Sequence, residues 1–130
     1  MCLILDKDTY KRLKANEDII VYKALLCNTI VDGKKILFTP YQRYKVEIGG
    51  AYKSRLVKSK SYCPHIKLGF HTFINLPDID KMFKYLDVNT KAYIAKCVIP
   101  KGSHYYIGRY YSSDMPDSYA SNKLTYLEIL

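Results

Sequence analysis

Alternating apolar and polar positions recur along this chain and predict a fold built mainly from β-strands. Residues 92–99 alternate with a period of two and include β-branched and aromatic side chains, which is typical of a strand. The longest apolar stretch, residues 19–31, is rich in Ile and Val, and Asp32-Gly33 directly after it is a hairpin signal. We expect strands near residues 19–31, 34–38, 44–48, 68–74, 92–99, 104–111 and 122–129.

Helical spacing is clearest in residues 76–86. Asn75 can cap such a helix and Pro77 is tolerated in its first turn. The apolar side chains that share one helical face are Ile79, Met82, Phe83 and Leu86. A thinner stripe predicts a short N-terminal helix over residues 6–14. The expected fold class is therefore α+β, with a mainly antiparallel sheet, one main helix at about 76–86 and a short N-terminal helix.

Length and composition indicate one folded domain that spans residues 1–130. The chain is 48% hydrophobic and 25% charged, a balance that argues against disorder. It has no run of eighteen apolar residues, so we expect no membrane span. Its first residues lack the basic start of a signal peptide, and we expect the protein in the cytoplasm.

The four cysteines are scattered, and the sequence contains no Cys-x-x-Cys motif. Cys27 and Cys97 lie inside strand patterns, where a free thiol behaves as a small buried hydrophobe. Cys63 and His65 could supply two metal ligands, but no second pair stands at a plausible spacing. We therefore expect reduced cysteines, no bound metal and no cofactor.

The positive charge is concentrated in one segment. Residues 34–67 hold nine Lys or Arg and a single acid, Glu47, so they carry a net +8 of the chain's +9. Such a segment attracts polyanions, although solvated lysines can also serve only to keep a protein soluble. Within it, residues 51–63 have no apolar period, and we expect them to be an exposed connection.

Tyrosines crowd the last third of the chain and allow two interpretations. They can form cross-strand aromatic pairs that stabilise a sheet. They can also form a platform for a planar base, with basic side chains beside them to receive phosphate. If the strands form one sheet, the polar residues that would converge into such a ligand site are Tyr22, Lys23, His71, Lys101, His104, Tyr106 and Arg109.

The order of several short motifs resembles a group of small uncharacterised proteins from bacteriophages and their bacterial hosts. The motifs are Gly69-Phe70-His71, the stretch Ile99-Pro100-Lys101-Gly102-Ser103, then Tyr105-Tyr106-Ile107-Gly108 and Tyr119-Ala120-Ser121. The resemblance covers residues 20–130. It implies a phage-type role in the host cytoplasm, such as sequestering a host signal molecule.

A second resemblance is to the ADP-ribosyltransferase fold. Tyr22-Lys23 would stand at its aromatic-Arg motif, with Lys in place of Arg, and His71-Thr72-Phe73 would stand at its Ser-Thr-Ser motif. Glu128 would be the catalytic acid, without the usual second Glu or Gln. The resemblance implies that any enzyme of this kind would use His71 and Glu128 and would have lost or changed its catalysis.

Three classes of function follow from these observations. The first is a binding protein for a nucleotide or another phosphate-bearing small molecule, with Lys and Arg for phosphate and Tyr and His for a base. The second is an enzyme on NAD or a nucleotide, ADP-ribosyltransferase-like, in which His71, His104 or Glu128 would do acid–base work. The third is a nucleic-acid or protein-binding module that uses residues 34–67 on a phosphate backbone.

Overall fold

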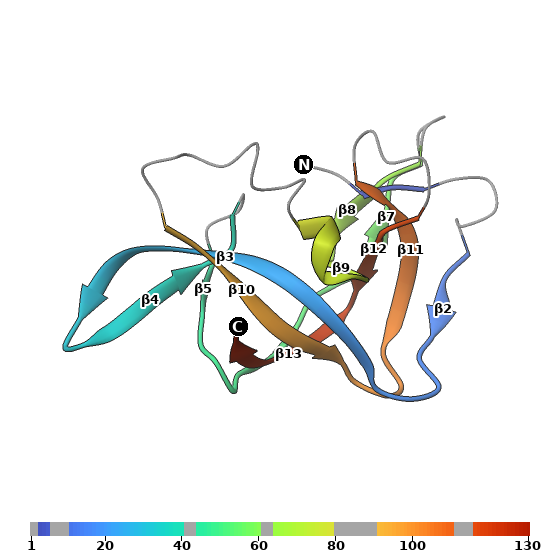
Figure 1. Ribbon diagram of the computed structural model, residues 1–130. Coiled ribbons are helices and arrows are strands. Elements are labelled where there is room, and N and C mark those ends of the chain that lie inside the picture. Colours follow the sequence, from blue (N-terminus) through green and yellow to red (C-terminus); the bar gives the residue numbers. More distant parts are fainter. Residues whose placement is uncertain (1–2, 6–10, 41–43, 61–63, 80–90, 111–115) are drawn as a thin grey trace.

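Figure 1 shows the computed structural model of the protein, which describes residues 3–5, 11–40, 44–60, 64–79, 91–110 and 116–130. These residues are almost all β-structure, with strands and one 3-10 helix. The elements are β1 (Leu3–Ile4), β2 (Leu13–Lys14), β3 (Ile19–Val31), β4 (Lys34–Phe38), β5 (Lys45–Val46), β6 (Ala51–Lys53), β7 (Val57–Lys58), β8 (Ile66–Leu68), β9 (Phe70–Phe73), η1 (Leu76–Ile79), β10 (Lys91–Ile99), β11 (His104–Tyr110), β12 (Ser118–Ser121) and β13 (Lys123–Ile129).

Five strands of the main sheet, β3, β10, β13, β12 and β9, are linked into a ring, by pairing in every case except β12 and β13, which follow each other in the chain. β3 pairs with β10 over nine residue pairs, and β10 pairs with β13. Only Asn122 separates β13 from β12, and β12 pairs with β9. β9 returns to β3 at the single pair Tyr22↔Phe73. All of these pairs are antiparallel. Because successive side chains of a strand point to opposite faces, the ring has an inner face where alternate side chains meet and an outer face.

Hydrogen bonds outside the strand ladders tie three segments together at one corner of the ring. The turn after β10 is tied to the segment between β2 and β3, since Ala15 N donates to Ser103 O and Gly102 N donates to Ala15 O, both at 2.8 Å. The third segment is Asn122, between β12 and β13, whose Oδ1 accepts a hydrogen bond from His104 N at 2.9 Å. Strands that bend at such corners can pass from one side of a closed sheet to the other. In Figure 1 the β3–β4 hairpin extends at one end of the molecule, and β2 and β11 lie at the other.

The main core fills the inner face of the ring. Val21 and Leu25 of β3 are fully buried there with Ala95 and Cys97 of β10 and Leu124 of β13. Burial raises the pKa of the Cys97 thiol to about 12, so the group stays protonated and apolar in character at neutral pH. The expectation that Cys27 and Cys97 are buried free thiols is confirmed.

The α+β prediction is wrong. The described part of the expected main helix is the four-residue 3-10 helix η1, and no α-helix occurs among the described residues. The described end of the expected N-terminal helix is strand β2, which pairs with β11. Local capping and apolar spacing favoured a helix in both places. In η1 a single buried apolar residue, Ile79, packs against Ala24 and Phe73. In β2 the pairing with β11 determines that the chain is extended. Met82, Phe83 and Leu86 lie outside the described residues.

The strand predictions are confirmed to within one or two residues, except at 68–74, where the chain forms two strands, β8 and β9, that belong to different sheets. The hairpin signal is confirmed as well, since Asp32 and Gly33 both have positive φ, 51° and 78°. The expectation that residues 51–63 are an exposed connection is wrong where these residues are described: β6 pairs with β13, β7 pairs with β8, and Leu56 is buried. Among the described residues, no helix is long and apolar enough to cross a membrane.

Candidate ligand-binding pocket

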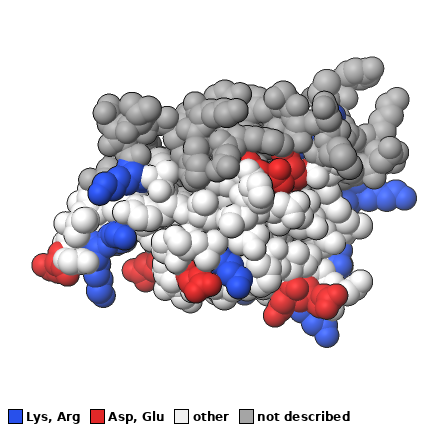
Figure 2. Space-filling view, viewed as in Figure 1, with Lys and Arg blue, Asp and Glu red and all other residues white. Residues whose placement is uncertain are grey.

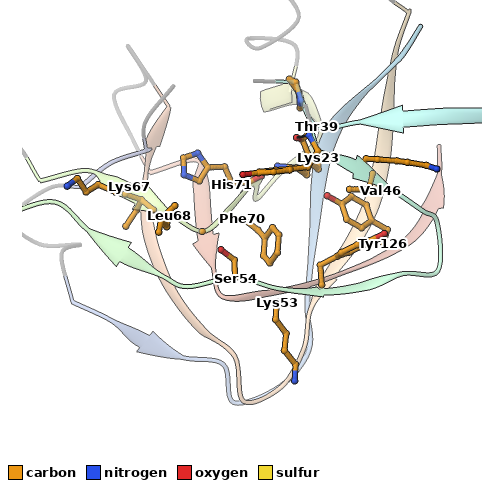
Figure 3. Close-up of a pocket in the computed structure, with 16 residues that line it drawn as sticks. Lys23, Thr39, Val46, Lys53, Ser54, Lys67, Leu68, Phe70, His71 and Tyr126 are labelled. Carbon is orange, nitrogen blue, oxygen red and sulfur yellow. Dashed lines mark hydrogen bonds between the residues drawn. The ribbon is translucent and has the colours of Figure 1, made fainter. Parts of the chain in front are cut away.

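A cavity of about 600 Å³ opens between the inner face of the ring and the segments that cover it. Its size lies within the range of small-molecule sites. Figure 3 shows Lys67, Leu68 and His71 on one side of the cavity, Val46 and Tyr126 on the other, and Phe70 and Lys23 between them. The lining residues are Lys23, Thr39, Pro40, Tyr44, Lys45, Val46, Tyr52, Lys53, Ser54, Ile66, Lys67, Leu68, Gly69, Phe70, His71 and Tyr126.

Lys23 occupies an inner position of β3, between the buried side chains of Val21 and Leu25. Its Nζ donates a hydrogen bond to the main-chain oxygen of His71 at 2.7 Å. Burial lowers the pKa of Lys23 from 10.5 to about 8, because the ammonium loses hydration inside the cavity. The described residues offer Nζ no carboxylate partner, so its remaining donors are available to a ligand.

His71 is held as a neutral imidazole. Burial, together with the neighbouring charge of Lys23, lowers the pKa of His71 to about 3. At neutral pH its ring therefore carries one donor and one acceptor nitrogen and no charge. The side chain can hydrogen-bond to a ligand, but it cannot act as a cationic phosphate receptor.

Two tyrosines form one wall of the cavity. Tyr52 and Tyr126 meet edge to face, with ring centroids 5.6 Å apart. The Tyr52 hydroxyl accepts a hydrogen bond from Glu47 N at 2.8 Å, and a Cβ on Gly50 would come within 2.8 Å of the Tyr52 ring. The tight loop before β6 therefore sets the position of Tyr52. The Tyr126 hydroxyl is buried and has no hydrogen-bond partner among the described residues.

The rim of the cavity is basic. Lys45, Lys53 and Lys67 line it, and all three are exposed. None of the described lining residues is acidic. These three lysines belong to the basic segment 34–67, so part of that segment and the inner-face Lys23 share one cavity. Other members of the segment have different roles: Lys35 lies over the ring of Tyr93, 4.4 Å from its centroid.

Of the seven predicted site residues, the structure brings Lys23 and His71 together in this cavity. Tyr22 points to the outer face of β3, where it packs near η1. The turn residue Lys101 is exposed, and its main-chain N donates to Asp18 Oδ1 at 2.8 Å. His104 lies at the corner described above. These three residues do not line the cavity.

Tyr106 and Arg109 lie on β11, away from the cavity lining. Tyr106 is 7% exposed and belongs to a second core cluster with Leu3 and Ala120. Arg109 is half-buried and is paired with Ile4 of β1. Here the tyrosine-rich strand forms protein core, and the edge-to-face pair of Tyr105 and Tyr119 is an aromatic pair across β11 and β12.

Sequence reasoning missed most of the cavity. The lining residues that were not predicted include Tyr44, Lys45, Tyr52, Lys53 and Phe70. One signal could have found several of them, because Tyr-Lys pairs occur at 10–11, 22–23, 44–45 and 52–53 and the last three pairs contribute their lysines to the cavity.

Two other groups considered at the sequence level lie elsewhere. Glu128 is exposed on β13 and does not line the cavity. His65 Nδ1 lies 3.0 Å from Ser59 Oγ, and the main chains of these two residues are also bonded across the β7–β8 hairpin. Cys63 lies outside the described residues, and the described residues hold no cluster of three or more His, Cys, Asp or Glu that could bind a metal ion.

Comparisons of the chain with protein-family models, with curated proteins and with solved structures found no match.

Proposed function

We propose that this protein binds a nucleotide or another phosphate-bearing small molecule in the cavity around Lys23. The observation that carries the proposal is a lysine on the inner face of a closed sheet, with a main-chain carbonyl as its partner and a cavity in front of it. Removing an ammonium from water is costly unless a counter-charge repays that cost. An anionic ligand would supply the counter-charge.

The charges around the cavity favour phosphate over other ligands. Lys23 can donate two further hydrogen bonds, and hydrogen bonds to charged groups contribute about 1.5–3 kcal/mol each. Lys45, Lys53 and Lys67 also line the cavity, and Figure 3 shows the ammonium groups of Lys53 and Lys67 directed outward, where their charge would attract an anionic ligand to the site. A ligand with more than one anionic group suits this arrangement best.

The aromatic side chains favour a planar group on the same ligand. Tyr52 and Phe70 are half-buried and line the cavity. Stacking of a base on an aromatic side chain contributes about 1–3 kcal/mol per base. His71 and the Ser54 side chain line the same cavity and add neutral polar groups for the edge of a base.

The proposed role is to hold the ligand, as the resemblance to phage proteins that sequester a host signal would imply. The competing role, an ADP-ribosyltransferase-like enzyme, would need His71 and Glu128 to act together. The neutral state of His71 and the exposed place of Glu128 outside the cavity favour the holding role.

Calorimetric titration with a panel of mono-, di- and cyclic nucleotides tests the proposal. Lys23→Met should weaken the tightest interaction by about tenfold to a hundredfold, the loss of about 1.5–3 kcal/mol. The matched control is Lys34→Met, which removes an exposed lysine of the β3–β4 hairpin outside the cavity. It should leave the affinity unchanged. Equal affinities for wild type and Lys23→Met would reject the pocket.

Nucleic-acid binding by the basic segment is the alternative outcome of the same titrations. On the face seen in Figure 2, basic and acidic side chains are interspersed over the described residues, and the face shows no broad basic patch. Backbone binding releases many counterions and weakens steeply with added salt. A duplex or single strand that binds with such a salt slope, while no nucleotide binds below millimolar, would replace the pocket proposal.

A further inference from the structure

The position of Lys23 permits covalent chemistry in addition to electrostatic binding. The strand around it is fixed, because β3 is paired with β10 at Ala95↔Lys23, and its Nζ is held 2.7 Å from the main-chain oxygen of His71. A neutral amine that donates one N–H to that oxygen keeps its lone pair for a group in the cavity. Aromatic and apolar side chains form much of the cavity wall, and three exposed lysines also line it.

We infer that Lys23 condenses reversibly with the carbonyl group of a phosphate-bearing aldehyde and holds it as an imine. The inference rests on the proposed pocket and narrows its ligand class. Lysines that form imines in proteins are activated by an apolar site or by a neighbouring cation, and burial supplies the first condition here. The lowered pKa of Lys23, about 8, means that a substantial fraction of the amine is neutral near physiological pH.

The chemical step balances without a further reactant. The lone pair of Nζ forms a bond to the carbonyl carbon, and the carbonyl oxygen takes up a proton to give a carbinolamine. The oxygen then leaves as water and a carbon–nitrogen double bond remains. In the net balance both hydrogens of that water come from the amine. Water entering the open cavity reverses the step, so the protein captures and releases the aldehyde and consumes nothing.

The rim lysines would give this reaction its selectivity. The side chains of Lys45, Lys53 and Lys67 are exposed and can turn toward the opening, and a phosphate held there would place the rest of a small ligand inside the cavity, towards Lys23. Holding two reactants in this way raises their effective concentration. An aldehyde without a phosphate would lack that hold and should react at Lys23 more slowly.

The test uses pyridoxal 5′-phosphate as a planar, phosphate-bearing aldehyde probe, and pyridoxal as its counterpart without phosphate. The wild-type protein is treated at pH 7.5 and reduced with borohydride, and the labelled lysines are mapped by peptide mass spectrometry. We expect label on Lys23 in at least tenfold excess over exposed Lys34. We also expect at least tenfold faster labelling of Lys23 by the phosphorylated probe.

Two variants complete the experiment. Lys53→Met should reduce the preference for the phosphorylated probe while Lys23 remains the labelled residue. Lys23→Met should remove the dominant label and leave the label on Lys34 unchanged. The inference is overturned if wild-type label is spread over exposed lysines and Lys23 carries no more than Lys34, a result that does not depend on whether any variant folds.

The outcome is separable from that of the proposed nucleotide binding. If nucleotides bind and Lys23→Met weakens them, but the probe spares Lys23, the covalent inference alone fails. If the probe selects Lys23 and no nucleotide binds, the covalent inference is supported and the ligand class of the pocket becomes the phosphorylated aldehyde. If the probe labels Lys23 selectively and a bound nucleotide suppresses that labelling, the result supports both the covalent inference and the proposed nucleotide binding.

Discussion

Lys23 on β3 and Tyr106 on β11 were both expected to contact a ligand, and the structure places them in contrasting surroundings. Lys23 faces a cavity of about 600 Å³, and the described residues use only one of its N–H donors, in the hydrogen bond to the His71 main-chain oxygen. Tyr106 is packed into a core cluster with Leu3, Leu56 and Ile66. Both are polar residues in strands rich in apolar neighbours. The difference is what lies against each side chain: Lys23 meets the main-chain oxygen of His71 and an open cavity, whereas apolar side chains pack around Tyr106.

The contrast between the two regions predicts different consequences for similar mutations. In the pocket region, a mutation should change ligand affinity more than stability. In the β11 region, a mutation should change stability more than affinity.

The largest expected effect is on the core side of the comparison. Tyr106→Ala removes a buried aromatic side chain and should lower the free energy of unfolding by about 3–5 kcal/mol. The protein that remains folded should bind its ligand as the wild type does. Urea unfolding measures the first quantity and calorimetry the second. A stable Tyr106→Ala protein with weakened binding would place Tyr106 in the site.

The pH dependence of stability isolates Lys23 on the pocket side. The folded protein releases the Lys23 proton near pH 8, and the unfolded chain keeps it to about pH 10.5. Between these values the unfolded state binds more protons, so the contribution of Lys23 to the free energy of unfolding rises with pH. Lys23→Met should therefore exceed wild type in stability below pH 8.

The difference in free energy of unfolding between Lys23→Met and wild type should shrink between pH 8 and 10.5. The decrease should be about 1.4 kcal/mol for each pKa unit and at most about 3 kcal/mol in total. Urea titrations of both proteins at pH 7, 8, 9 and 10 measure it. A difference that stays constant over this range would mean that Lys23 is not desolvated in the folded protein.

Two glycines extend the comparison. A Cβ on Gly108 would lie 2.6 Å from the main-chain oxygen of Ile4, so Gly108→Ala forces β1 away and should cost about 1–3 kcal/mol of stability. A Cβ on Gly50 would meet the Tyr52 ring at 2.8 Å, and Gly50→Ala should displace that pocket wall and weaken ligand binding. In thermal unfolding Gly108→Ala should be the more strongly affected variant, and in calorimetric titration with ligand Gly50→Ala should be. If the same variant were the more affected in both assays, the two regions would not differ in their effects on stability and affinity.

The smallest effect concerns buried hydroxyls. Tyr126 Oη and Thr72 Oγ1 are buried without a hydrogen-bond partner among the described residues. Leaving a buried polar group unsatisfied costs about 1–3 kcal/mol. Tyr126→Phe and Thr72→Val should therefore each raise the free energy of unfolding, by about 1 kcal/mol. A loss of stability in either variant would show that its hydroxyl has a partner in solution.

The strands were predictable because their signals are local. Ile and Val in residues 19–31 and the Asp32-Gly33 turn are enough to define β3 and β4, and alternation defines β10. The helix prediction failed because capping and apolar spacing are only weak preferences, and long-range strand pairing overrides them. β6 was missed because its three residues carry no apolar period of their own and are defined by their pairing with β13.

The site was less predictable than the strands because its walls come from distant parts of the chain. Lys23 and His71 are joined across 48 positions of sequence. The local feature that separates Lys53, which lines the cavity, from Lys34, which lies outside it, is a preceding Tyr, and Lys11 also follows a Tyr without lining the cavity. The period-two pattern of β3 does contain one clue: Lys23 takes an inner position between Val21 and Leu25, and a charged residue at such a position suggests a functional site.

Amide chemical-shift mapping during a nucleotide titration of wild-type protein tests the central claim most directly, because it reports which of the two regions meets the ligand. The account predicts that the largest shifts occur at Lys23, Ser54, Phe70 and His71, with β11 unchanged. Shifts concentrated at His104, Tyr106 and Arg109, with Lys23 and His71 unmoved, would contradict it.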